Sequence, residues 1–526
     1  MRRWSNSSWI AIVAIAVVSL GTPTAALADD LARLEEEIDS WHLKEARTTL
    51  ERLDDSLKDT PRALYLTGKL LFCEGDYSKA AAELRRAIEG AKAELGWKAL
   101  RNMAAQAERV FMDLSVKQGS SGQFVYRFAN GPDALLVPYA EETLVRQLDA
   151  LQQALGDRPD FVIEIDILPD VEALAAASGL SVEQVERTGT VGVTKYGRVM
   201  IISPRGLAMG YPWLDTLAHE LTHLAITRVS RNRAPIWLHE GIAKLLERRW
   251  RGEQLGVLTP EEAYLLDRAA REGRLIPLRR FHPSVAHLPN QEDAALAYAQ
   301  VLSLMRYLEE KLGDGWTRFL LERIGGGESI DGALVTLSKF TLRRLYLWWR
   351  QAVSGRRQTP VPAVNMMKRR FKRGQTSTES ASESLLGVDV RRHLRVGDLL
   401  RLRGHVRAAV IEFQRAERLA QSPSPEISDR LSACLLELGD SKAVAEKLPK
   451  MAEIYPSHAT IFVQLGKALA AEKKLGEAAT SLERANAINP FHPDVHCTLK
   501  ELYKELGRVE DAKLEEEHCR LLAATQ

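Results

Sequence analysis

Apolar residues recur at helical spacing in the first and last parts of the chain, whereas the middle part mixes short alternating stretches with helical ones. In both outer parts, small residues stand at positions where two antiparallel helices would approach each other closely. The middle part predicts a few strands followed by several helices. The pattern therefore predicts an α+β central domain, with a small mixed sheet plus helices, between two all-α regions.

The first helical region repeats its small and apolar positions after 34 residues, in the pairs Ala46 and Ala80, Leu50 and Leu84, and Leu53 and Ala87. This period, together with the small residue Gly68, resembles the tetratricopeptide repeat. We expect residues 29–118 to form two such repeats and an additional helix pair.

Residues 389–526 carry the same kind of pattern and predict a second tetratricopeptide array. Its clearest repeat contains Leu465, Gly466, Ala478, Leu482, Ala485 and Pro490. The stretch around Leu436 is a degenerate member, so we expect about four repeats, which can bury a continuous core. Arrays of this type imply protein or peptide partners that bind in a concave groove.

Residues 355–388 are predicted to be a linker, because a basic run at 368–373 is followed by a polar stretch from Gln375 to Ser384. The favoured interpretation is a solvated linker, and the alternative is that the basic run touches an anionic membrane surface. Such a linker would let the C-terminal array move relative to the central domain.

Three stretches of the central domain predict strands: Phe124–Phe128 with its rings on one face, 161–166, and 190–203 as two strands broken at Lys195-Tyr196-Gly197. Helices are expected afterwards at about 261–273, 293–312, 315–324 and 329–354.

The N-terminus resembles an export signal. Arg2 and Arg3 precede an apolar run of about a dozen residues that is too short for an ordinary membrane span. Small residues then lead to an expected cleavage point after Ala28, so residues 1–28 are predicted to be a signal peptide. The alternative is an uncleaved anchor. The prediction implies a periplasmic or secreted protein with no stable transmembrane span after cleavage.

The chain has 526 residues, of which 45% are hydrophobic and 27% charged, so it can build sizeable cores. Its formal net charge of +2 gives no case for nucleic acid as a partner. The cysteines Cys73, Cys434, Cys497 and Cys519 all fall in repeat helices. Cys497 and Cys519 lie on the paired helices of the last repeat, where they form either a disulfide or two separate core cysteines.

The clearest chemical motif is His-Glu-x-x-His at residues 219–223. Residues four apart share one face of a helix, so His219 and His223 can offer imidazoles to one metal ion, with Glu220 beside them. Pro235 suits the start of a following helix that presents Glu240. Gly241 lacks a side chain and so permits close approach of another helix.

These residues resemble the gluzincin class of zinc peptidases, in particular the peptidase MA-like domains of bacterial envelope proteins. The match consists of His219, Glu220, His223, Trp237, Glu240, Gly241 and Ala243, together with Ala297-Tyr298-Ala299-Gln300 on a later helix. The resemblance covers roughly residues 120–350 and implies a zincin-like catalytic domain, assigned to residues 119–354.

The resemblance also implies roles for single residues. His219, His223 and Glu240 would bind Zn²⁺, and Glu220 would be the general base. Tyr298 would hydrogen-bond the oxyanion, the alternative being a buried core tyrosine. The strand at 199–202 would be the edge that pairs with substrate, or else a plain sheet strand.

One position departs from the family pattern. Four residues after the third ligand, thermolysin-like enzymes have an aspartate, whereas this chain has Lys244. The residue that orients a ligand histidine is therefore open, and Asp215 and Glu247 are the candidates.

The sequence thus predicts an exported zinc metallopeptidase that recruits protein or peptide substrates through helical repeats. Two alternatives remain: a non-catalytic envelope scaffold that binds proteins, and a zinc hydrolase acting on non-peptide amides.

Overall fold

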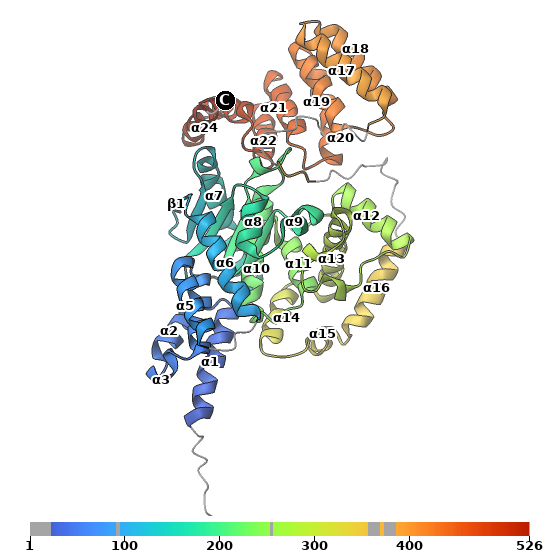
Figure 1. Cartoon of the computed structure of the whole chain (residues 1–526). Coiled ribbons are helices and arrows are strands. Elements are labelled where there is room, and N and C mark those ends of the chain that lie inside the picture. The colour runs from blue at the N-terminus through green and yellow to red at the C-terminus, as the bar shows by residue number, and fades with distance from the viewer. Residues whose placement is uncertain (1–22, 91–94, 253–255, 356–368, 373–385, 525–526) are drawn as a thin grey trace, which may run out of the picture.

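A computed structural model describes residues 23–90, 95–252, 256–355, 369–372 and 386–524. The molecule is mostly helical. The first helices pack at one end of a central mixed sheet, further helices cover the sheet, and the last helices form an array at the opposite end (Figure 1). No helix in these ranges is both long enough and apolar enough to cross a membrane.

The strands within the described ranges form one mixed sheet in the order β1-β2-β3-β5-β4. Their bounds are β1 Leu114–Gln118, β2 Phe124–Ala129, β3 Ile163–Leu168, β4 Gly192–Lys195 and β5 Arg198–Ile202. Strands β2, β3 and β5 run parallel, while β1 and β4 join the two edges antiparallel. The alternation in β2 is confirmed, because Phe124, Tyr126 and Phe128 are all buried. The sheet begins at Leu114 rather than after residue 118.

The expectation that the strand at 199–202 lies at the sheet edge is wrong. This strand is β5, which pairs with β3 on one side and with β4 on the other. The turn at Tyr196-Gly197 folds β4 back outside β5, and every residue of β5 is buried as a result. The exposed edge on this side of the sheet is therefore β4.

Helices pack around the sheet in an order close to the predicted one. Those of the central domain are α7 Leu136–Leu155, α8 Val171–Ser178, α9 Val182–Thr188, α10 Trp213–Ser230, α11 Ile236–Leu246, α12 Pro260–Arg271, α13 Gln291–Leu312, α14 Trp316–Gly325, α15 Ile330–Ser338 and α16 Leu342–Ser354. The single helix expected at 329–354 is thus two helices. A Cβ added at Gly241 would lie 2.8 Å from Met305 Cγ, so α11 and α13 approach closely because this residue is glycine.

The N-terminal region consists of α1 Pro23–Asp39, α2 Leu43–Arg52, α3 Asp55–Lys58, α4 Pro61–Cys73, α5 Tyr77–Glu89 and α6 Leu95–Phe111. Helices α1 with α2 and α4 with α5 form the two expected pairs. The additional pair is a single helix, α6, because the chain enters β1 directly after it. Residues 1–22 of the expected signal peptide lie outside the described residues, and α1 contains its remainder.

After residue 386 the described chain forms four helix pairs, as the repeat pattern predicts. They are α17 Val388–Leu402 with α18 Val406–Leu419, α19 Pro425–Glu437 with α20 Ser441–Ile454, α21 Ala459–Ala471 with α22 Leu475–Asn486, and α23 Pro493–Glu505 with α24 Val509–Ala523. A disulfide joins Cys497 to Cys519 across the last pair, whereas Cys73 and Cys434 are free and buried.

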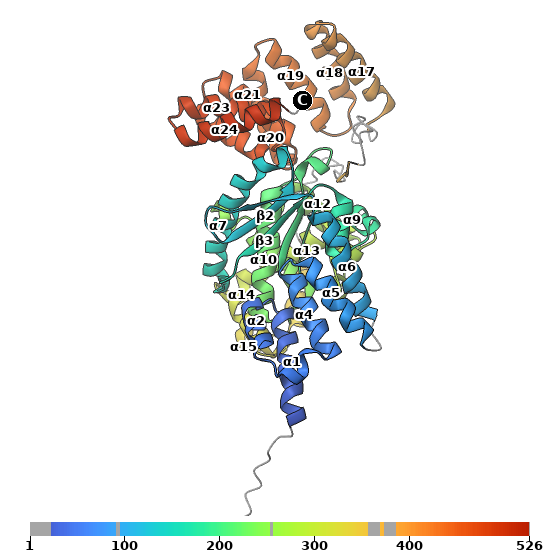
Figure 2. The same cartoon turned by 60° about the vertical axis from the view of Figure 1, so that its left-hand side comes forward.

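The inner end of this array is built into the central domain (Figure 2). The indole nitrogen of Trp213, the first residue of α10, donates to the backbone oxygen of Asn486 over 3.1 Å. The backbone N–H of Tyr211 donates to the oxygen of Ile488 over 3.0 Å. Ala487 and Leu522 belong to the same buried core as the sheet. The expectation that the C-terminal array moves freely relative to the central domain is therefore wrong for this end of the array.

The outer end of the array differs. Helices α17 to α19 form a separate core around Phe413, which shares no residue with the central one. The array thus has a docked half and a half that projects from the domain.

Candidate metal centre

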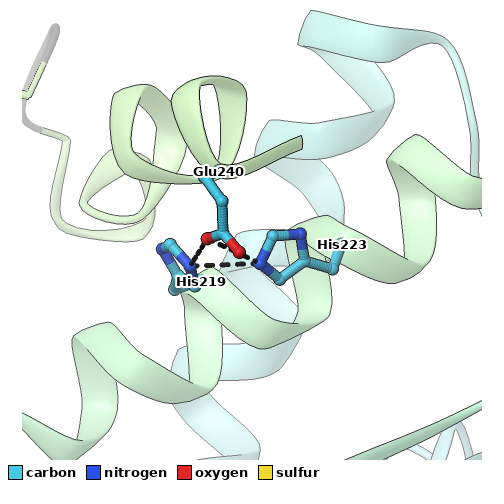
Figure 3. A group of neighbouring side chains, drawn as sticks. All are labelled: His219, His223 and Glu240. Atoms are coloured by element: carbon cyan, nitrogen blue, oxygen red, sulfur yellow. Dashed lines mark hydrogen bonds and ion pairs between the residues drawn. The ribbon is translucent and has the colours of Figure 1, made fainter. Parts of the chain in front are cut away.

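Two helices bring the motif residues together (Figure 3). Helix α10 carries His219, Glu220 and His223, and it is buried along most of its length. Arg231 and Asn232, both with positive φ, end this helix and reverse the chain. Pro235 then starts α11, which crosses back over α10 and presents Glu240.

Three ligand-type atoms converge at one point. His219 Nε2 lies 3.1 Å from His223 Nε2, and Glu240 Oε2 lies 3.4 Å and 3.5 Å from these two nitrogens. In a tetrahedral zinc site with bonds near 2.0 to 2.1 Å, ligand atoms lie about 3.3 Å apart. The triangle therefore has the size that a bound metal ion requires.

The bonding of these atoms supports the same conclusion. Glu240 Oε2 is buried and has no hydrogen-bond partner among the described residues. A buried carboxylate oxygen without a partner is costly, and a cation removes that cost. Two imidazoles and a carboxylate are also a donor set that suits zinc. The three residues therefore fit a metal ion.

Glu247 orients the first histidine. Its Oε2 accepts from His219 Nδ1 over 3.1 Å, which directs Nε2 at the point where the three ligand-type atoms converge. Lys244, the residue that departs from the family pattern, donates to Glu247 Oε1 over 2.7 Å and holds this carboxylate in place. Asp215, the other candidate, is bound instead by Arg251 at 2.9 Å.

The charges at the centre are strongly coupled. Burial lowers the pKa of His219, but the neighbouring carboxylates of Glu240 and Glu247 outweigh this effect and raise the pKa to about 9. Burial raises the pKa of Glu240, and His223 and His219 reverse that shift and hold it well below the usual range. Each histidine therefore faces an ionised carboxylate in the metal-free protein.

Glu220 lies beside the triangle without belonging to it. Burial raises the pKa of its carboxyl group, and His223, His219 and Thr194 oppose this rise. The Thr194 hydroxyl donates to Glu220 Oε2 over 2.7 Å. A Cβ added at Gly192 would lie 2.7 Å from Glu220 Oε1, so only glycine leaves room for this carboxylate. Edge strand β4 therefore fixes the position of Glu220.

Tyr298 lies on α13 with its ring 6.1 Å from the His219 ring, centroid to centroid. It is half-buried rather than enclosed in the core. Burial raises the pKa of its hydroxyl group, and Glu240 and Glu220 raise it further. The hydroxyl group therefore stays protonated, and the charges of both glutamates act on it.

Sequence reasoning missed two residues of this centre, Gly192 and Thr194. Both lie on β4, and the signal that could have found them is the break at Tyr196-Gly197, which makes β4 the outer strand of a hairpin. Neither residue type on its own indicates a site.

A second group with the same composition lies between α7 and the last repeat. It contains His496, Glu515 and His518. Together with Tyr139 of α7, we call this group the docking cluster. We call His219, His223 and Glu240 the motif cluster. His496 Nδ1 lies 2.6 Å from Glu515 Oε2. The Tyr139 hydroxyl donates to Glu515 Oε1 over 2.7 Å and lies 2.9 Å from His518 Nδ1. The docking cluster thus joins the array to the central domain.

Comparison with known proteins gives one family-model match, in the central part of the chain. Residues 140–355 match the family model described as Peptidase MA superfamily. No curated protein matches the chain. The central part is therefore peptidase-like, and helical repeats flank it in the structure.

Three solved structures are similar at low scores. MamA from Desulfovibrio magneticus RS-1 is 22% identical, covers 26% of this chain and 75% of its own, and has a TM-score of 0.22. The TPR domain of P58(IPK) is 12% identical over 92% of this chain and 99% of its own, with a TM-score of 0.22. Native yeast LTA4 hydrolase is 12% identical over 77% and 67%, with a TM-score of 0.30. These TM-scores are too low to inform the fold or the function.

Proposed function

We propose that the protein is a zinc-dependent peptidase that hydrolyses peptide bonds in protein or peptide substrates. The observation that carries the proposal is the motif cluster, in which a buried carboxylate oxygen without a hydrogen-bond partner lies 3.4 Å and 3.5 Å from two imidazole nitrogens. His219, His223 and Glu240 would hold the ion. When bound, zinc supplies Lewis acidity, which lowers the pKa of a water molecule to about 7 and polarises a substrate carbonyl.

Glu220 acts as the general base. Its burial raises the pKa, so the carboxylate is a stronger proton acceptor than a solvated glutamate. It accepts a proton from the attacking water and returns it to the leaving amine. Thr194 and Gly192 keep this carboxylate beside the motif cluster while the proton moves.

Tyr298 donates a hydrogen bond to the oxygen on which negative charge develops. Its raised pKa keeps the proton on the hydroxyl group, as a donor requires. The variant Tyr298→Phe is expected to lower kcat by roughly 10²-fold with unchanged zinc content. Full activity of this variant would leave Tyr298 as a structural residue.

The helical repeats recruit substrates or partner proteins, and the outer half of the C-terminal array offers a surface that is not used for docking. We further propose that the chain is exported to the periplasm or secreted. The signal-like N-terminus supports this location, and so does the Cys497–Cys519 disulfide, because disulfides persist in oxidising compartments.

Cleavage of an unfolded protein tests the proposal. Zinc-loaded full-length chain should produce defined fragments by mass spectrometry, whereas Glu220→Gln, which keeps the side-chain volume, should bind zinc equally well and be slower by several orders of magnitude. A wild-type chain that binds the unfolded protein and zinc but never cuts it would support the scaffold alternative. Hydrolysis of simple amides without peptide cleavage would support the non-peptide hydrolase.

A further inference from the structure

A short piece of the linker, Arg369–Lys372, lies against the central domain. Phe371 forms an antiparallel bridge with Leu207, just after β5. The backbone N–H of Ala208 donates to the oxygen of Arg370 over 3.0 Å, and that of Lys372 donates to the oxygen of Gly206 over 2.8 Å. This part of the basic run is therefore bound to the domain, contrary to the expectation of a solvated linker.

Gln291, the first residue of α13, fixes the start of this segment. Its side-chain oxygen accepts from the backbone N–H of Arg369 over 2.8 Å, and its side-chain nitrogen donates to the backbone oxygen of Arg369 over 3.0 Å. Since α13 also carries Tyr298 two turns further on, the same helix positions Arg369 and this candidate catalytic hydroxyl.

The Arg369 guanidinium points toward the start of β4. Its Nη1 donates to the backbone oxygen of Gly189 over 2.7 Å, and Gly189 precedes β4 by only a few residues. Burial raises the pKa of Tyr298 and of Tyr211, and the positive charge of Arg369 opposes the rise in both. The guanidinium therefore lies just before the start of β4, the strand that holds Glu220.

The guanidinium of Arg369 makes one hydrogen bond to a backbone oxygen and no ion pair among the described residues. The residue as a whole is exposed, whereas burial of its guanidinium lowers the pKa of Arg369. Two carboxylates interact with it electrostatically. Glu247 is already bound to His219 and Lys244. Burial and Glu262 raise the pKa of Glu261 to about 7, so Glu261 is only partly ionised at neutral pH.

We propose that Arg369 binds a carboxylate group of the peptide substrate beyond the start of β4 and thereby sets specificity. A guanidinium has five N–H donors, and a free pair of them matches the two oxygens of a carboxylate. An extended substrate beside edge strand β4 would carry one of its ends or side chains past this position. The carboxylate is either the C-terminal one or that of an aspartate or glutamate side chain. The inference rests on the proposed peptidase function.

Two pairs of matched peptides test the proposal and separate the two sources. One pair differs only in a C-terminal carboxylate against a C-terminal amide, and the other only in glutamate against glutamine within an amidated peptide. For full-length wild type, kcat/KM should be at least roughly tenfold higher for the acidic member of one pair, the effect of one hydrogen bond to a charged group. In Arg369→Gln the ratio should fall to near unity. The matched control Arg370→Gln removes a charge from the neighbouring exposed residue and should keep the preference.

Peptide binding distinguishes failure of this inference from failure of the proposed function. Fluorescence anisotropy with zinc-loaded Glu220→Gln, and with the same variant carrying Arg369→Gln, reports recognition without turnover. Tighter binding of the acidic peptide that is lost in the Arg369→Gln variant supports the carboxylate site, even when the wild type cleaves no peptide. Cleavage without acid preference, a preference that survives Arg369→Gln, or absence of preference in both assays would overturn it.

Discussion

The motif cluster and the docking cluster each contain two histidines and a glutamate, yet their atoms are arranged in opposite ways. In the motif cluster the three facing atoms are 3.1 to 3.5 Å apart, and Glu240 Oε2 lacks a hydrogen-bond donor among the described residues. In the docking cluster Glu515 contacts His496 at 2.6 Å and the Tyr139 hydroxyl at 2.7 Å, and this hydroxyl lies 2.9 Å from His518 Nδ1 and 3.5 Å from His496 Nδ1. The first geometry brings three metal-ligand atoms around one point at the spacing of a zinc site, whereas the second pairs hydrogen-bond donors with acceptors.

The difference shows that composition alone does not define a metal site. His496 illustrates the point, because its Nε2 contacts the oxygen of Pro490 while its Nδ1 contacts Glu515, so both ring nitrogens are used in hydrogen bonds. A metal ion entering there would have to replace bonds that already exist. We infer that the motif cluster binds the metal and that the docking cluster fastens the last repeat to α7.

The largest expected effect follows from removing the docking cluster with its array. A chain ending at Arg357 exposes Trp213 and Tyr211, which are buried in the whole molecule. We expect this chain to aggregate or to unfold without cooperativity, and to lose its zinc, as circular dichroism and metal analysis would show. As a control, Phe413→Ala should cost about 3 to 5 kcal/mol in the outer repeats but leave zinc bound. A truncated chain that is folded and zinc-loaded would contradict the docked arrangement.

Breaking the disulfide should have the next largest effect. Cys497 and Cys519 are 22 residues apart, and closing a loop of that length stabilises by about 3 kcal/mol in the chain-entropy model. Replacing both by serine should lower the free energy of unfolding by this amount in denaturant titrations. Zinc content should not change, since the disulfide belongs to the docking side of the molecule. Loss of zinc from this variant would mean that the two clusters depend on each other more closely than their geometry indicates.

A substitution beside the motif cluster should weaken zinc binding without abolishing it. Glu247→Gln removes the carboxylate that orients His219, and loss of such a partner typically costs 10- to 100-fold in affinity. Competition with a chelator would measure this change. Asp215→Asn is the matched comparison: it removes a buried partner of Arg251 and should lower stability while leaving zinc affinity unchanged. Equal zinc affinities in the two variants would refute the assignment of Glu247.

The smallest effect is a pH dependence that comes from the docking cluster. Burial, reinforced by His496 and Lys117, lowers the pKa of His518 to about 3, against about 6.5 in the unfolded chain. Between these values the unfolded state binds more protons, so the free energy of unfolding decreases as the pH falls. The contribution is about 2 kcal/mol between about pH 7 and about pH 5.

The variant His518→Asn isolates this contribution. Its stability should depend less on pH over that interval than that of wild type, as denaturant titrations at the two pH values would show. Removal of an exposed histidine, His405→Asn, is the control. An unchanged pH dependence in His518→Asn would mean that His518 does not titrate as its burial requires.

Local sequence patterns predicted many elements of the fold and several residues of the motif cluster. The four-residue spacing of His219 and His223 follows from helix geometry alone. Gly241 predicted the close approach of another helix, and the structure shows that this helix is α13. The alternation in β2 and the repeat helices are likewise visible in the sequence, because each depends on neighbours close along the chain. These features require only the period of the element.

The remaining features depend on residues far apart in the sequence. The choice between Asp215 and Glu247 depended on where α11 ends relative to α10. Edge strand β4 is recognisable only when the sheet order is known. Tyr139 and Glu515 meet across more than 300 positions, and nothing in either local stretch marks them as partners.

Metal content tests the central distinction most directly. Zinc is measured per chain in full-length wild type, Glu240→Gln and Glu515→Gln, at a free zinc concentration that just saturates the wild type. The two variants are comparable because each substitution keeps the side-chain volume and removes one carboxylate. We predict one equivalent in wild type, a sharp loss in Glu240→Gln and one equivalent in Glu515→Gln. Two equivalents in wild type, with one lost in Glu515→Gln, would contradict the account.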